Sequence, residues 1–144
     1  QVKHDTAFDP GFQVTYGALV EVEEHPFALE KLVLMDYRDT YIDDAGMAAR
    51  NERFPSFMYV MPISDTKIFF EETILVSRPG GDPRDLEERL KKRLATSYGI
   101  PEFRVLEQER AAIPMGGMDP VVPQRTVGCG STASCIHPAS AAAS

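Results

Sequence analysis

The sequence predicts an α+β domain in which one helix packs on an antiparallel sheet. Three observations indicate this fold class: short apolar runs with a period of two, one helix with clear boundaries, and the position of that helix before the last strand. The 144 residues are 43% hydrophobic and 26% charged, which is typical of a globular domain. The net charge of -7 argues against nucleic-acid binding, because phosphate contacts need clustered lysine and arginine.

Four strands are predicted before the helix. Apolar and other residues alternate over 14–22, as in a half-buried strand. Aliphatic and aromatic runs predict two more strands at 31–37 and 56–61, the latter closed by Pro62. A turn at Ser64 and Asp65 leads into the fourth strand, 67–76. Residues 40–53 are polar, small and charged, and are interpreted as a long connection that could contain a short helical turn.

The helix is predicted over residues 83–98. Asp82 is a favourable N-cap, and Pro83 suits the first helical position. Leu86, Leu90 and Leu94 form an apolar stripe at a spacing of four residues. Gly99 stands where a helix commonly ends, and a fifth strand is expected over 103–111.

Two adjacent carboxylates in the fourth strand are the most unusual feature. Side chains alternate along a strand, so Glu71 and Glu72 point to opposite faces and one of them faces the buried side. A desolvated glutamate has a raised pKa and can donate a proton near neutral pH. The alternative is an edge strand with both carboxylates solvated, or paired with Arg38 or Arg78.

Other candidate groups are less specific. Asp36 and Arg38 close the second strand, either beside a cleft or as a surface ion pair. Gly116 and Gly117, in the proline- and glycine-rich connection 113–125, allow backbone to approach a ligand closely. Gly128 and Gly130, in the segment 127–138, resemble a loop that approaches a phosphate or cofactor. No metal site is expected, because Cys129, Cys135 and His137 do not have the spacing of zinc ligands.

Taken together, the motifs resemble the C-terminal half of the plant and algal lycopene cyclases, flavoproteins that close the end rings of carotenoids. Seven segments carry the resemblance and occur in the order found in that family. They are 16–27 (YGALVEVEEHPF), 35–39 (MDYRD), 57–62 (FMYVMP), 69–73 (FFEET), 113–117 (IPMGG), 123–125 (PQR) and 137–138 (HP). Each is weak alone, but seven in order are specific.

The resemblance implies a fold like that of FAD-dependent monooxygenases and geranylgeranyl reductases. Residues 1–112 would form the substrate-binding sheet region, and 113–144 would return into the FAD-binding domain. The chain is expected to be a partial sequence, lacking the N-terminal Rossmann half and inactive alone. Reduced FAD, with NADPH as its reductant, is the implied cofactor. Its implied contacts are Gly116, Gly117, Gly128, Gly130, His137 and Pro138. The ending ASAAAS departs from the family's usual glycine-containing turn near the flavin.

The implied reaction is a redox-neutral, acid-catalysed cyclisation of the ends of lycopene. Glu71 matches the first glutamate of the family motif and would be the acid, with Glu72 supporting it. Unless a bulge turns both to one face, only Glu71 would meet the substrate. The predicted substrate-binding residues are Phe57, Tyr59, Phe69, Phe70, Asp36 and Arg38.

The motifs favour β-ring over ε-ring formation. The segment MDYRD and Phe70 look more like the ε-cyclases, which remain an alternative. The capsanthin–capsorubin and neoxanthin synthases share the motifs and also remain alternatives, as do a flavin reductase or monooxygenase and a non-catalytic binding module. The resemblance also implies a plastid location, a lipophilic carotenoid substrate and peripheral association with a membrane.

Overall fold

The computed structural model describes residues 9–115 and residue 125. Five strands form one antiparallel sheet, in the spatial order β2-β3-β4-β1-β5. The α+β class and the antiparallel sheet are therefore confirmed, and a second helix is added. The elements in chain order are β1 (Gly11–Glu21), β2 (Val33–Asp36), α1 (Ala45–Arg53), β3 (Ser56–Ser64), β4 (Lys67–Ile74), α2 (Pro83–Ser97) and β5 (Arg104–Met115).

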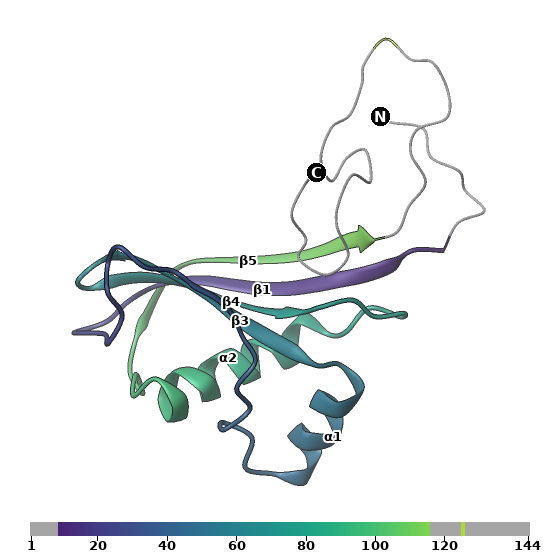
Figure 1. The fold of residues 1–144 in the computed structure, drawn as a ribbon, viewed down its shortest axis with the longest axis horizontal. Helices are drawn as coiled ribbons and strands as arrows, with labels where there is room; N and C mark the ends of the chain where they lie inside the picture. The colour runs from purple at the N-terminus through teal and green to yellow at the C-terminus, as the bar shows by residue number, and fades with distance from the viewer. Residues whose placement is uncertain (1–8, 116–124, 126–144) are drawn as a thin grey trace.

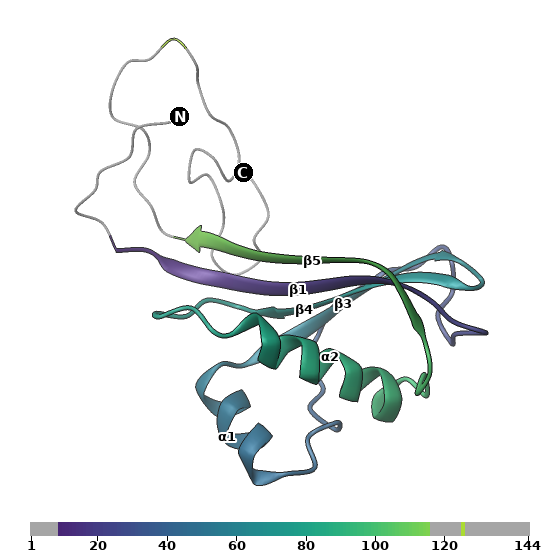
Figure 2. The ribbon, with the colours of Figure 1, turned by 180° about the vertical axis from the view of Figure 1, so that it is seen from behind.

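Both helices lie on the same side of the sheet (Figures 1 and 2). We call this side the helix face and the opposite side the distal face. The main core fills the space between the sheet and α2. Its members are aliphatic and aromatic side chains, among them Val14, Tyr16, Val20, Met58, Val60, Ile68, Phe70, Leu86, Leu90 and Leu94. The distal face carries the side chains that alternate with these, so each strand presents a different set to each side.

Helix α2 forms as the sequence predicts. The Asp82 side chain accepts a hydrogen bond from the backbone N–H of Arg84 at 2.9 Å, and Pro83 opens the helix. Leu86, Leu90 and Leu94 are buried against the sheet. Gly99 has a φ of 70°, the left-handed conformation that glycine adopts without steric cost. The helix thus ends within a residue of its predicted end.

Three strands run further than predicted: β1 begins at Gly11 rather than at residue 14, and β3 and β5 end later than expected. β3 continues past Pro62 to Ser64. Pro62 has no backbone N–H to donate, but β2 pairs with β3 only as far as Val60, so β2 does not need a hydrogen bond from Pro62. β5 extends to Met115, and Pro114 is accommodated because β5 is an edge strand. β5 therefore crosses the predicted division between residues 112 and 113.

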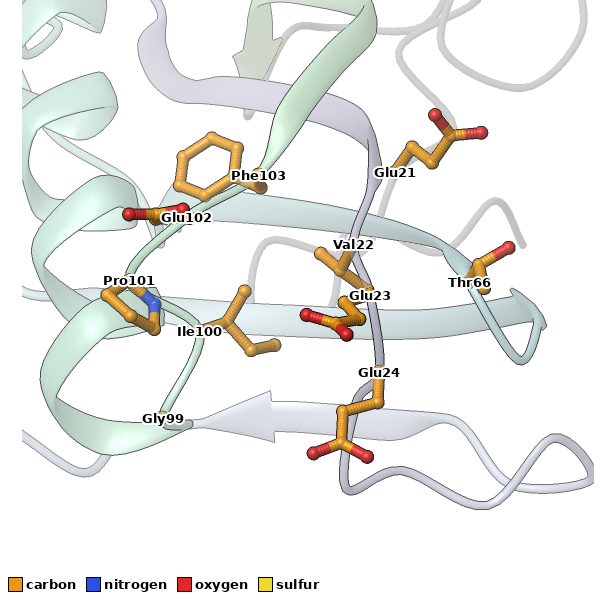
Figure 3. A pocket seen from close by; sticks show the side chains of 10 residues that line it. All are labelled: Glu21, Val22, Glu23, Glu24, Thr66, Gly99, Ile100, Pro101, Glu102 and Phe103. Atoms are coloured by element: carbon orange, nitrogen blue, oxygen red, sulfur yellow. The ribbon is translucent and has the colours of Figure 1, made fainter.

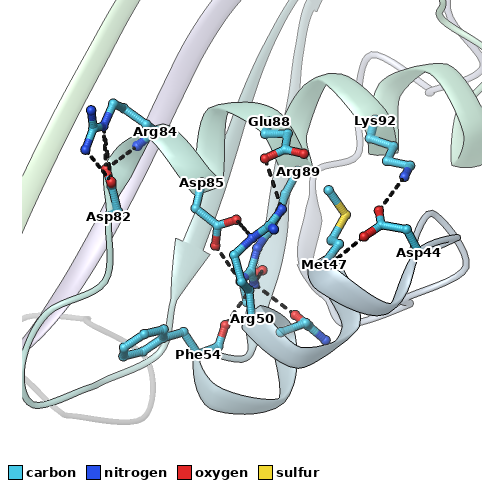
Figure 4. Close-up of polar contacts among 12 residues, drawn as sticks. Asp44, Met47, Arg50, Phe54, Asp82, Arg84, Asp85, Glu88, Arg89 and Lys92 are labelled. Carbon is cyan, nitrogen blue, oxygen red and sulfur yellow. Dashed lines mark hydrogen bonds and ion pairs between the residues drawn. The ribbon is translucent and has the colours of Figure 1, made fainter.

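Helix α1 was not predicted as a full element. Asp44 caps it by accepting the Met47 N–H at 2.8 Å, and Met47 is its only fully buried residue. Nine residues with one buried apolar position leave no periodic stripe to detect. Its partners are on α2: Arg50 contacts Asp85 at 2.6 Å, as Figure 4 shows. Tertiary ion pairs therefore stabilise α1, a helix that the local sequence pattern alone does not indicate.

Candidate functional site

The paired glutamates of β4 are divided between the two faces of the sheet. Glu71 is aligned with Gly17 of β1 and Tyr59 of β3, whereas Glu72 is aligned with Tyr16 and Met58. The register between β1 and β4 is continuous through this region, so no bulge turns the two side chains to one face. Glu71 therefore points to the distal face and Glu72 to the helix face.

Glu72 is fully buried and forms a bidentate ion pair. Arg93 of α2 donates from Nε and Nη2 to the two carboxylate oxygens, each at 3.0 Å. The Ser56 hydroxyl donates to Glu72 Oε1 at 2.6 Å. Such a pair needs these hydrogen bonds, because a buried carboxylate without them is strongly unfavourable. Glu72 thus ties the sheet to α2, and any support it gives to Glu71 would pass through the strand.

The buried ion pair belongs to a longer polar network between the sheet and the helices. Arg89, with its side chain fully buried, donates to Ser56 Oγ at 3.0 Å and to Asp85 at 2.6 Å. Asp85 also accepts from Arg50 of α1 (Figure 4). Arg93 reaches further, to the backbone carbonyls of Asp36 and Arg38. One network therefore links β2, β3, β4 and both helices.

The sequence contains a signal for this network, although the network was not predicted. Arg89 and Arg93 follow Leu86 and Leu90 by three residues, which places them on the same helix stripe. Two arginines within a buried stripe require buried acidic partners. Glu72 is one such partner, reached from a strand rather than from the helix.

Glu71 has a different environment. It is half-buried, and its Oε1 accepts a hydrogen bond from the Thr73 hydroxyl at 3.0 Å. Burial raises the pKa of Glu71, the Thr73 hydrogen bond opposes that rise, and the neighbouring Glu109 carboxylate adds to it. A carboxyl with a raised pKa retains its proton nearer to neutral pH, as a general acid must.

Aromatic side chains flank Glu71 on the distal face. Tyr59 is its cross-strand neighbour, and Phe69 lies two residues earlier on β4. Phe57 is buried beside Tyr59, with ring centroids 5.0 Å apart. The structure thus brings together three of the four predicted aromatic wall residues. Phe70 is the exception: strand alternation places it in the core beneath α2, where it stacks on Tyr98.

A groove of about 370 Å³ lies along the same part of the sheet. Its apolar lining comes from the distal-face side chains of β1, β3 and β4, and its polar lining from β5 and Lys67. The lining residues are Leu19, Met61, Ile63, Lys67, Phe69, Glu107, Gln108 and Glu109. The groove therefore reaches the strand positions next to Glu71.

Asp36 and Arg38 form an ion pair with each other, at 2.6 Å. The Tyr98 hydroxyl also donates to Asp36, at 2.9 Å. Burial would raise the pKa of Asp36, but the hydrogen bonds from Arg38 and Tyr98 outweigh it and hold this pKa at about 2. Asp36 lies on the helix side with Tyr98, away from Glu71. The pair is therefore internally satisfied, and a role in substrate binding stays a prediction.

A second hollow, of about 750 Å³, lies where β1 ends and β5 begins (Figure 3). Four glutamates line it: Glu21, Glu23, Glu24 and Glu102. Arg104 pairs with Glu21. Within the described ranges, no group of three or more histidine, cysteine, aspartate or glutamate side chains is arranged to hold a metal ion. The acidic lining by itself indicates no ligand.

The residues predicted to contact a flavin lie outside the described part of the chain. They are Gly116, Gly117, Gly128, Gly130, His137 and Pro138.

Gly17 makes the close packing around Glu71 possible. A Cβ atom at this position would lie 2.7 Å from Phe69 Cζ and 2.8 Å from Glu109 Cγ. We therefore expect Gly17→Ala to reduce the free energy of unfolding by about 1–3 kcal/mol, as overpacking does. Urea denaturation of the chain measures this loss. In a Phe69→Leu background the loss should shrink, because the ring carbon is gone; an equal loss in both backgrounds would contradict the packing argument.

The family model described as "Lycopene cyclase protein" matches residues 2–141. The chain is 49% identical, over 95% of its length, to lycopene beta cyclase of Narcissus pseudonarcissus, covering 27% of that protein. It is 48% identical to the Arabidopsis thaliana lycopene beta cyclase, with 95% and 27% coverage. The neoxanthin synthase of Solanum tuberosum is 38% identical, with 95% and 28% coverage. The chain spans about a quarter of the length of these relatives. It belongs to the lycopene cyclase family.

Proposed function

We propose that this chain is the part of a lycopene beta-cyclase that supplies the catalytic acid and part of the substrate surface. The observation that carries the proposal is the position of Glu71. It is a half-buried carboxyl with a raised pKa, set among aromatic side chains on a face that holds an apolar groove. An uncharged polyene needs such a surface, and its cyclisation needs a proton.

In the proposed reaction, the Glu71 carboxyl gives its proton to the terminal double bond of lycopene. A C–H bond forms and a carbocation is left on the neighbouring carbon. A second double bond attacks that carbon and closes the ring, which moves the positive charge to a ring carbon. A base then takes a different proton from a carbon next to that charge, and the electron pair of the broken C–H bond forms the new ring double bond. The substrate gains one proton and loses another, so the cyclisation involves no net oxidation or reduction. Phe57, Tyr59 and Phe69 would exclude water. The faces of aromatic rings also attract cations, so these side chains would stabilise the carbocation.

Reduced FAD, with NADPH as its reductant, is part of the proposal for the whole protein. A bound reduced flavin would supply negative charge near the carbocation. The chain's predicted flavin contacts fall outside the described residues, so we derive no step through the flavin. The monooxygenase-like fold of the whole protein is likewise proposed from the family resemblance.

Two observations favour a β-cyclase over a capsanthin/capsorubin synthase and over a non-catalytic binding module. The beta cyclases of Narcissus and Arabidopsis are 49% and 48% identical to the chain, whereas a capsanthin/capsorubin synthase of Citrus sinensis is 43% identical. A non-catalytic binding module would leave Glu71 solvated with an ordinary pKa, and Glu71 is instead half-buried with a raised one. An ε-cyclase would use the same acid and differ in which proton is lost.

We propose a plastid location, because the cyclase relatives are named chloroplastic or chromoplastic. Peripheral association with a membrane is proposed from the lipophilic substrate. Among the described residues, no helix has the length and apolar character needed to cross a bilayer.

The proposal is tested in a composite cyclase, in which this chain replaces the matching quarter of the Narcissus relative. The protein is expressed in bacteria that accumulate lycopene, and the pigments are separated by chromatography. We expect γ-carotene and β-carotene. δ-Carotene would instead assign ε-ring formation. Unchanged lycopene with folded protein that has bound FAD would refute the cyclase proposal.

A further inference from the structure

A second glutamate lies beside Glu71 on the distal face. Gly17 of β1 is aligned with Glu71 of β4 on one side and with Glu109 of β5 on the other. Residues aligned across neighbouring strands point to the same face. Glu71 and Glu109 therefore flank one position on the same side of the sheet, although they lie on strands that are not adjacent.

The position between them carries no side chain. The Glu109 side chain leans over Gly17: its Cγ would lie 2.8 Å from a Cβ there, and its Oε1 would lie 3.1 Å from that Cβ. The space that a larger residue would fill is thus occupied by the Glu109 carboxylate, on the path toward Glu71. Phe69 closes the same space from β4.

We propose that Glu109 is a positioning residue for Glu71: its carboxylate, held over Gly17, disfavours a second negative charge there and keeps the Glu71 carboxyl in its proton-bearing form. The inference rests on the proposed function, in which Glu71 is the acid. It adds the means by which an acid in a shallow, half-buried site holds its proton between turnovers. Two carboxyls that share one site do not readily ionise together.

The other charged and titratable groups around Glu71 do not cancel this effect. Tyr59 faces it from β3, and Thr73 on β4 donates a hydrogen bond. From β5, Glu107 lies on the same face and is also acidic. Lys67 of β4 is aligned with Glu21, at the far end of the strand. Among the described residues, neither Glu71 nor Glu109 forms an ion pair with a lysine or arginine. Glu109 is also one of the causes of the raised pKa of Glu71.

The test is the pH dependence of cyclisation by the composite cyclase in vitro. The acid works only when protonated, so activity falls as pH rises through the pKa of Glu71. Glu109→Gln keeps the size of the side chain and removes its charge. We expect the alkaline limb of the rate profile to move to lower pH by about one unit. Glu109→Asp keeps the charge and should restore most of the profile.

Glu107→Gln is the matched control, because it also removes one carboxylate charge from the distal face of β5, two residues from Glu109. Whatever it does to the rate, it should move the alkaline limb much less than Glu109→Gln does. An unmoved limb in Glu109→Gln, or an equal shift in both variants, would overturn the role of Glu109.

A direct titration separates this inference from the proposed function. Carbon-13 NMR of the Glu71 carboxyl in the 144-residue chain reports its pKa without any turnover. Glu109→Gln should lower that pKa by about one unit even if the composite cyclase proves inactive. An unchanged pKa of Glu71 would refute the charge effect, whatever pigment the composite cyclase makes.

Discussion

Glu71→Gln in the composite cyclase should leave lycopene uncyclised, with the rate reduced at least about a hundredfold. Glutamine has nearly the same shape as glutamate and accepts the Thr73 hydrogen bond, but it has no acidic proton to give. Pigment chromatography measures the effect in cells, and initial rates with purified protein measure it in vitro. Glu71→Asp keeps the acid on a shorter side chain and should retain part of the activity.

Glu102→Gln is the control for this prediction, because Glu102 is exposed and lies in the other hollow. It should cyclise lycopene like the unaltered protein. If Glu71→Gln formed rings at the normal rate, the proton would come from another group, and the assignment of Glu71 as the acid would be wrong.

The pH dependence of stability separates a catalytic from a structural effect of the same substitution. The pKa of Glu71 is raised in the folded state above its ordinary value of 4.5. The folded chain therefore binds this proton more tightly than the unfolded chain. The resulting stabilisation is complete below pH 4.5 and is lost as pH rises through the folded pKa. Glu71→Gln should remove this contribution, so at neutral pH its free energy of unfolding should not fall below that of the original chain.

Arg93→Met should be the most destabilising single substitution in the ion-pair network. It leaves the Glu72 carboxylate fully buried without its cation, and the expected loss is about 3–5 kcal/mol in the free energy of unfolding. Burial lowers the pKa of Arg93, but the attraction of Glu72 outweighs it and holds this pKa above its usual value. Arg93 is therefore charged at neutral pH. Urea denaturation followed by circular dichroism measures the loss.

Arg84→Met provides the comparison on the same helix. Arg84 also forms an ion pair, with Asp82, but the Arg84 side chain is 87% exposed. Its loss should cost far less than the loss of Arg93, because solvent screens an exposed ion pair. The double variant Glu72→Leu with Arg93→Met should recover much of the stability lost in Arg93→Met, because no unpaired charge stays buried. Equal losses for Arg93→Met and Arg84→Met would contradict the structural role assigned to Glu72.

Local sequence was sufficient for the elements whose signals are local. The boundaries of α2 depend on Asp82, Pro83 and Gly99, and each acts within one turn of the helix. The separation of Glu71 from Glu72 follows from strand alternation alone. The resemblance to the lycopene cyclases likewise needed only ordered motifs, and the family model confirms it.

Elements defined by distant partners were not accessible in this way. Helix α1 has one buried apolar residue, and its stabilising contacts come from Asp85 and other groups on α2. The sequence places Arg89 within the leucine stripe, but it does not identify the partners that allow this arginine to be buried. β5 runs past the predicted division between residues 112 and 113 and includes Pro114, because the edge of a sheet tolerates a proline.

The sequence by itself determined that the two glutamates of the pair would point to opposite faces of their strand. Which glutamate is buried depends on where the helices pack, and the tertiary structure decided that by placing Arg93 opposite Glu72. Only the sheet order brought Glu109 next to Glu71, because β1 inserts Gly17 between the strands that carry them. The period of two along a strand assigns each side chain to a face of the sheet. The pairing of distant strands decides which charged side chains lie together on one face. Those neighbouring charges in turn affect the protonation of the proposed acid.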